Sequence, residues 1–169
     1  GKLYSTLTNR LLLEASAGAP PPSVAPYLDL VRQIGVVEGQ LVAYPGSPRL
    51  AAACMRADDR AALCELERGE ISALREEFRR DSRVAVHARD GYEALLALIP
   101  PREKRGLVLI DPPYEQPDEF ERLYASLTSA LQRWPAGTFA VWYPIKHGGD
   151  AAHFVARMKA TGVRRQLVA

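Results

Sequence analysis

Short apolar runs alternate with amphipathic segments from residue 44 to the carboxyl terminus. The apolar runs have the length of strands, whereas the amphipathic segments repeat apolar residues at helical spacing. We expect strands over 61–66, 84–88, 107–110, 138–143 and 164–168, and helices over 48–57, 70–79, 92–99, 118–134 and 150–161. Strands that alternate with helices through short loops predict a parallel sheet with helices on both faces.

The first 40 residues follow a different pattern. A partial apolar face predicts a helix over 6–15, and the segment 17–26, which holds four prolines, is a loop. A short amphipathic helix is expected over 27–34, followed by an extended segment over 39–43. We therefore expect a small helical part over residues 1–40, lying apart from the sheet, and an α/β core over residues 41–169.

The composition is that of a soluble globular protein. Of 169 residues, 47% are hydrophobic and 25% are charged, and the formal net charge of +2 permits nucleic-acid binding without demanding it. No apolar run is long enough to span a bilayer and no charged-then-apolar leader opens the chain. We expect a cytoplasmic monomer without a membrane partner. Cys54 and Cys64 lack metal-ligand spacing, so we expect buried free thiols and no metal site.

The strand predicted over 107–110 ends in a stiff polar turn. Its continuous apolar run is typical of a strand buried on both faces. Asp111 follows, and Pro112 and Pro113 make the chain leave the sheet, because proline fixes φ and cannot donate to a ladder. Tyr114 comes next. A carboxylate and an aromatic ring therefore stand at the carboxyl end of a strand, where open α/β sheets bind ligands.

These residue types suit a planar nitrogen nucleophile such as an exocyclic amine. Asp111 can accept one of its two N–H groups and the carbonyl oxygen of Pro112 the other, and the two bonds direct the nitrogen lone pair toward an electrophile. Tyr114 offers a face on which a base can stack. The alternative is a helix-capping aspartate followed by a proline turn, which is the better interpretation for an aspartate alone.

Acidic residues end three of the predicted strands, at Glu65, Asp90 and Asp111. In a doubly wound sheet they would line one crevice, where a carboxylate is a usual partner of ribose hydroxyls. Asp90 and Gly91 can form a turn whose backbone approaches an adenine ring, although Asp-Gly is also favoured in plain turns. Ser47 precedes a predicted helix and can cap it.

The tetrapeptide D-P-P-Y resembles the motif of amino-methyltransferases, which use S-adenosylmethionine to methylate adenine N6, cytosine N4 or a glutamine amide. A longer ordered series resembles the RlmJ family over roughly residues 44–169. The series consists of YPGSP at 44–48, Glu65, DSRV at 81–84, Asp90-Gly91, residues 104–115 and WYPIK at 142–146.

The resemblance implies a Rossmann-like methyltransferase sheet and S-adenosylmethionine-dependent methylation of N6 of one adenosine in 23S ribosomal RNA. The base would have to be unpaired or flipped to reach the pocket. It also implies a set of residues at the cofactor, with Asp111 catalytic as well: Ser47, Glu65, Asp90, Gly91 and Asp111. Pro112 and Tyr114 join Asp111 as catalytic candidates on the chemistry above.

Family members also carry segments that this chain does not match. They begin with a basic, histidine-containing segment, a first strand and a glycine-rich turn, and they end with a final strand and an N-P-P-W segment. We therefore expect a fragment that is shortened at both ends and whose sheet is incomplete. In the segment that is present, Lys146 and His147 can meet RNA phosphate or form a plain exposed loop, and Trp142 is expected to pack in the core.

Two other functions are compatible with the sequence. One is a DNA adenine or cytosine amino-methyltransferase, which would usually carry a dedicated target-recognition region. The other is a truncated, non-catalytic module that binds a nucleotide or a partner protein. Binding of cofactor to this chain and to a longer one would separate the enzyme from the module.

Overall fold

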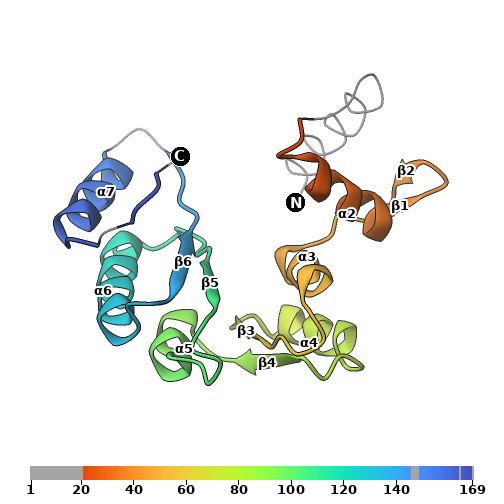
Figure 1. The fold of residues 1–169 in the computed structure, drawn as a ribbon, viewed down its shortest axis with the longest axis horizontal. Coiled ribbons are helices and arrows are strands. Elements are labelled where there is room, and N and C mark those ends of the chain that lie inside the picture. Colours follow the sequence, from red (N-terminus) through yellow and green to blue (C-terminus); the bar gives the residue numbers. More distant parts are fainter. Residues whose placement is uncertain (1–20, 146–148, 164, 169) are drawn as a thin grey trace. The chain divides into compact units, whose positions relative to one another are not determined.

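The computed structural model describes residues 21–145, 149–163 and 165–168, which are coloured in Figure 1. The helix predicted over 6–15 lies outside the described residues, as do Lys146 and His147. The chain divides into two compact units. The first runs to Leu63 and includes Leu74–Val86, and the second consists of Cys64–Ala73 and the chain from His87 onward. Each unit is described by itself.

The elements alternate as the sequence predicts, so the α/β fold class is confirmed. In chain order they are α2 (Ala25–Gly35), β1 (Val36–Val37), β2 (Gln40–Leu41), α3 (Ser47–Cys54), β3 (Ala61–Glu65), α4 (Arg68–Glu77), β4 (Val84–Ala88), α5 (Gly91–Leu98), β5 (Leu107–Ile110), α6 (Glu119–Arg133), β6 (Thr138–Val141) and α7 (Asp150–Ala160). None of the described helices is long and apolar enough to cross a membrane.

A helix and a small hairpin begin the described part of the first unit. Helix α2 confirms the prediction for residues 27–34 and buries Leu28 and Val31. Strands β1 and β2 then pair in antiparallel fashion through a two-residue turn. That turn has positive φ at both positions, 51° at Glu38 and 78° at Gly39, which is typical of a type I′ hairpin. The strands are too short to show an alternating pattern, so the sequence predicted only the second of them.

The described strands form three two-stranded sheets, β1–β2, β3–β4 and β5–β6. The β5–β6 pair is parallel and aligns Leu107 with Thr138. In the β3–β4 pair, the Ala61 amide donates to the Arg83 carbonyl at 2.9 Å and the Arg89 amide to the Glu65 carbonyl at 3.0 Å. The first bond joins the start of β3 to the start of β4, and the second joins their ends, so the two strands run in the same direction. The β3–β4 and β5–β6 pairs are therefore both parallel, as expected.

The last predicted strand does not form. Residues 165–168 are coil, and the Gln166 side chain donates to the Met158 carbonyl at 2.8 Å, which ties this segment to the end of α7. None of the strands that the structure describes pairs with this segment.

One face of the β5–β6 sheet is covered by helices. Val108 and Ile110 pack with residues of α5 and α6 in two clusters. The first cluster is centred on Leu95, Ile99, Ala130 and Trp134, and the second on Leu123, Leu127 and Phe154. Alternate residues of β5 point the other way, and Leu107 and Leu109 remain 67% and 57% exposed. The expectation that this strand is buried on both faces is therefore wrong for the part of the chain that the structure describes.

The cysteine prediction was half right. Both thiols are free, but Cys54 at the end of α3 is exposed, and only Cys64 is partly buried. Within the described ranges no group of three or more His, Cys, Asp or Glu side chains could hold a metal ion.

Candidate active site

The loop that follows β5 starts at an acceptor without a partner. The Trp142 amide donates to the Ile110 carbonyl at 3.0 Å, which extends the β5–β6 ladder up to Asp111. The carboxylate of Asp111 has no hydrogen-bond partner among the described residues. Its partial burial raises the pKa of the Asp111 carboxyl above its ordinary value. An unpaired carboxylate at a strand end is a ready acceptor for a donor on a ligand.

Tyr114 holds the middle of this loop in an uncommon conformation. Its φ of 54° lies in the left-handed region, which a tyrosine adopts at a cost. The Tyr114 hydroxyl donates to the Trp142 carbonyl at 2.7 Å, and the ring lies 5.0 Å from that of Phe120, centroid to centroid. Burial, together with the nearby Asp111 and Glu119 carboxylates, raises the pKa of Tyr114. The ring is thus fixed by packing on Phe120, and its use as a stacking face remains a prediction.

Asp90 joins the end of β4 to the start of α5. Its Oδ1 accepts from the amides of Tyr92 at 2.8 Å and Glu93 at 3.2 Å, which makes Asp90 the N-cap of the helix. Its Oδ2 accepts from Arg122 on α6 at 3.1 Å. Burial alone would raise the pKa of Asp90, but the bonds from Glu93, Tyr92 and Arg122 together hold it below its ordinary value. Asp90 is therefore ionised and fixed in orientation.

Gly91 leaves open space next to this carboxylate. A Cβ built on Gly91 would meet nothing within 4 Å, so packing of the described chain does not require glycine there. A small residue at the first position of α5 keeps the helix N-terminus accessible to a ligand.

Glu65 lies at the end of β3 and has one oxygen to spare. Its Oε1 accepts from the amides of Leu66 at 2.7 Å and Glu67 at 2.9 Å. Its Oε2 has no partner within the described part of the chain. The Arg89 amide reaches the Glu65 carbonyl, so the ends of β3 and β4 are neighbours and the Glu65 and Asp90 backbones lie near each other.

Ser47 belongs to the first unit, so whether it joins the other candidates stays a prediction. The expectation that it caps α3 is wrong. The N-cap is Gly46, in an extended conformation with φ −67° and ψ 165°, and no side chain caps the helix. Ser47 is the first residue of the helix, and the amides of Arg49 and Leu50 donate to the carbonyl of Gly46. The Ser47 hydroxyl is thus not used as a cap.

Two residues of α6 complete this region and were not found from the sequence. Tyr92 donates its hydroxyl to Glu119 Oε1 at 2.7 Å, and Glu119 is only 4% exposed. Burial and this bond raise the pKa of Tyr92. Glu119 and Arg122 stand three residues apart on one face of α6, a spacing visible in the sequence, but nothing there indicates which residues they contact.

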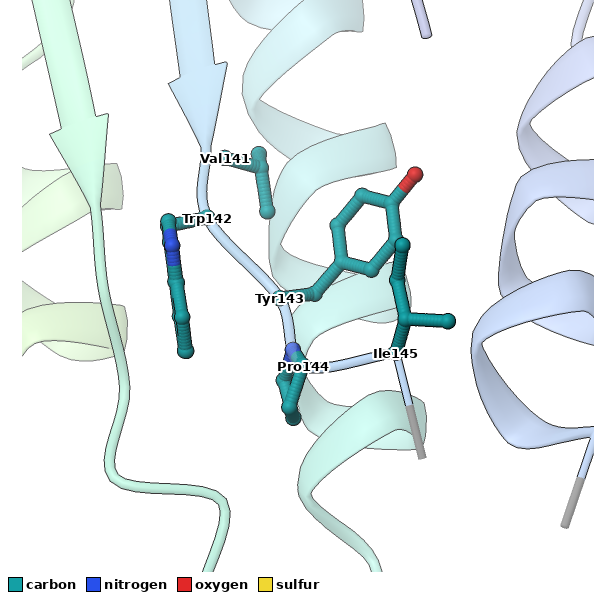
Figure 2. A pocket seen from close by; sticks show the side chains of 5 residues that line it. All are labelled: Val141, Trp142, Tyr143, Pro144 and Ile145. Carbon is teal, nitrogen blue, oxygen red and sulfur yellow. The ribbon is translucent and has the colours of Figure 1, made fainter. Parts of the chain in front are cut away.

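Trp142 and Tyr143 lie in different environments. Figure 2 shows the two side chains on opposite sides of the chain that leaves β6. Tyr143 packs on Phe154, with ring centroids 5.9 Å apart, whereas Trp142 is 48% exposed. Trp142 lies on the same face of the pair as Leu109 and Asp111, the face that no described helix covers. The prediction that Trp142 packs in the core is therefore wrong for the described chain.

Comparison with known proteins identifies close relatives. Ribosomal RNA large subunit methyltransferase J from Haemophilus influenzae is 35% identical over 147 residues, covering 87% of this chain and 52% of the relative. The protein of the same name from Escherichia coli matches with the same identity and coverage. The crystal structure of protein LPL1258 from Legionella pneumophila superposes with a TM-score of 0.83 at 33% identity, covering 90% of this chain and 56% of that one.

The chain spans about half the length of the curated relatives that it matches. The family model for ribosomal RNA large subunit methyltransferase D, RlmJ, matches residues 10–169, which include every candidate residue discussed above. The chain therefore belongs to the RlmJ family.

Proposed function

We propose that the protein carrying this chain transfers a methyl group from S-adenosylmethionine to N6 of an adenosine in large-subunit ribosomal RNA. The single observation that carries the proposal is the unpartnered Asp111 carboxylate next to Pro112 at the end of β5, in a chain whose relatives are named as ribosomal RNA methyltransferases.

The acceptors at the strand ends fit a nucleoside cofactor. Glu65 has a free Oε2 for a hydroxyl group, Asp90 is fixed in an ionised state, and Gly91 leaves room beside it. Bound there, S-adenosylmethionine would supply an electrophilic methyl group on a positively charged sulfonium. Ser47 is a further candidate contact, from the first unit.

Asp111 and Pro112 would orient the acceptor amine. The Asp111 carboxylate accepts one N–H and the Pro112 carbonyl the other, which holds the nitrogen lone pair in line for transfer. As the nitrogen gains positive charge, the carboxylate stabilises it. Tyr114 supplies an aromatic surface next to the base and holds the loop in shape through its hydroxyl.

The RNA substrate has to present its adenosine outside a helix. A base in a duplex cannot place its amine against Asp111, so a loop or a flipped nucleotide is required. Lys146 and His147 follow the end of β6 in the sequence and are candidates for phosphate contacts. We further propose that the protein acts in the cytoplasm as a monomer.

The test is methyl incorporation into unmodified 23S ribosomal RNA by the protein that the complete coding sequence specifies. Asp111→Asn keeps the size of the side chain but removes its charge, and we expect at least about a hundredfold lower kcat with little change in cofactor affinity. Asp118→Asn is the matched control, because Asp118 ends the same loop and its side chain caps nothing.

Two outcomes would contradict the proposal. Near-wild-type kcat in Asp111→Asn would remove the catalytic assignment. Transfer to DNA but not to ribosomal RNA would favour a DNA amino-methyltransferase instead.

A further inference from the structure

We propose that Arg122 is a positioning residue, which fixes the Asp90 carboxylate in the orientation that receives the methyl donor. The inference rests on the function proposed above. Arg122 lies on α6 and is 32 residues from Asp90 in sequence, yet its Nη2 stands 3.1 Å from Asp90 Oδ2. None of the motifs in the sequence includes it.

The hydrogen bonds around Asp90 leave it one defined acceptor position. An ionised carboxylate has about four such positions. Two on Oδ1 are filled by the amides of Tyr92 and Glu93, and one on Oδ2 is filled by Arg122. Because α5 holds one oxygen and α6 the other, the plane of the carboxylate cannot turn. The remaining position on Oδ2 therefore points in a set direction, which suits an N–H or O–H donor of a bound nucleoside.

Arg122 is itself held in place. Its guanidinium carbon lies 4.8 Å from the centroid of the Tyr92 ring, in a cation–π contact. The Tyr92 hydroxyl in turn bonds the buried Glu119, one turn before Arg122 on the same face of α6. The start of α6 thus holds the start of α5 at two points.

This arrangement connects Asp90, proposed to contact the cofactor, with the loop proposed to hold the acceptor amine. Helix α6 begins where the loop carrying Asp111 and Tyr114 ends. A change at Arg122 therefore loosens Asp90 without touching the groups that meet the acceptor amine. We therefore expect the substitution to lower the affinity for the cofactor and to leave kcat at saturating cofactor unchanged.

An ordinary surface ion pair is the competing interpretation, since such pairs contribute little. The Arg122 and Asp90 side chains are 42% and 24% exposed, so they are only partly shielded from water. The chain offers a matched control in Arg157 on α7. Arg157 lies 3.7 Å from the centroid of the Tyr124 ring and pairs with Glu121, so it makes the same two kinds of contact with none of the proposed cofactor residues.

The experiment uses the protein of the complete coding sequence with three variants, Arg122→Met, Arg122→Lys and Arg157→Met. Methionine keeps an apolar stem over the ring and removes the charge. The dissociation constants of S-adenosylmethionine and S-adenosylhomocysteine are measured by calorimetry, and kcat is measured at saturating cofactor. Amide hydrogen exchange at Tyr92 and Glu93 is followed in the cofactor-free protein.

We expect Arg122→Met to weaken binding of both cofactor forms about three- to tenfold, in keeping with a partly exposed charge-assisted bond, with kcat within about twofold of wild type. Exchange at the Tyr92 and Glu93 amides should accelerate. Arg122→Lys should recover part of the affinity, and Arg157→Met should match wild type in all three measurements.

Unchanged affinity in a folded Arg122→Met protein overturns the inference, and so does an equal loss in Arg157→Met. If Arg122→Met does not fold, Arg122→Lys decides, since wild-type affinity and exchange there also overturn it. If the wild-type protein methylates RNA and both Arg122 variants bind the cofactor normally, the proposed function stands and only the role of Arg122 is rejected. A wild-type protein that neither binds cofactor nor methylates RNA overturns both.

Discussion

Replacing Tyr114 by phenylalanine isolates the bond that ties the catalytic loop to the end of β6. The substitution keeps the ring against Phe120 and removes only the 2.7 Å bond from the hydroxyl to the Trp142 carbonyl. A neutral hydrogen bond of this kind contributes about 0.5–1.5 kcal/mol net. The left-handed conformation at Tyr114, with φ 54°, costs a residue with a Cβ roughly 1–2 kcal/mol. The bond therefore offsets much of the backbone strain.

Without that bond, the ordered loop loses population in proportion to the free energy removed. A loss of about 0.5–1.5 kcal/mol corresponds to a roughly two- to twelvefold fall in kcat/KM for RNA methylation. We expect the Tm to fall by only about 1–6 °C, since the packing of the ring remains. The assay is methyl incorporation into unmodified ribosomal RNA. Tyr143→Phe is the control, because Tyr143 is on the opposite side of the same segment and packs on Phe154.

Two results would refute this reasoning. Equal kcat/KM in Tyr114→Phe and Tyr143→Phe would mean that the bond does not order the loop. A loss greater than about a hundredfold would exceed what one neutral bond supplies, and would place the hydroxyl in the chemistry itself.

The remaining predictions concern a titration and a close contact. Because burial raises the pKa of Asp111, activity should fall on the acid side above the usual aspartate range of about 4, and a limb near 4 would contradict this. A carboxyl group with a raised pKa stabilises the folded state only at pH values below its ordinary pKa, and this contribution is lost as the pH rises. Asp111→Asn should therefore raise the Tm at pH 7 and leave the Tm unchanged at acid pH. Gly137→Ala would put a Cβ 2.5 Å from Trp134 Cε3 and should cost about 1–3 kcal/mol in urea unfolding. Gly46→Ala, whose Cβ meets only an ordinary 3.6 Å contact, should cost much less.

Local pattern was enough to predict most elements of the second half of the chain. Strands β4 and β5 have the predicted bounds, because short apolar runs there are flanked by polar or turn-forming residues. How strands assemble depends on partners far away in sequence, and so the pattern could not show that β3–β4 and β5–β6 would form separate pairs. The same limit explains Leu107 and Leu109. An apolar run indicates a strand, but not which of its faces is covered.

The residues of the candidate site also fall into those that local pattern predicts and those that it does not. Glu65, Asp90 and Asp111 were found because each ends a strand, which is a local feature. Arg122 and Glu119 were missed because their importance depends on contacts 32 and 27 residues away in sequence. Charged residues on an amphipathic helix are usually solvated, and only the structure distinguishes these two from their neighbours.

The uncovered face of β5 has a consequence for the behaviour of this polypeptide in solution. Leu107 and Leu109 present two large apolar side chains to water, and the described chain pairs β5 only through β6. A short strand with one open hydrogen-bonding edge and an apolar face is a template for other chains. Preparations of the isolated polypeptide should therefore associate as their concentration rises. Leu107→Lys should suppress this association, because a charge on an open edge disfavours pairing with a second strand.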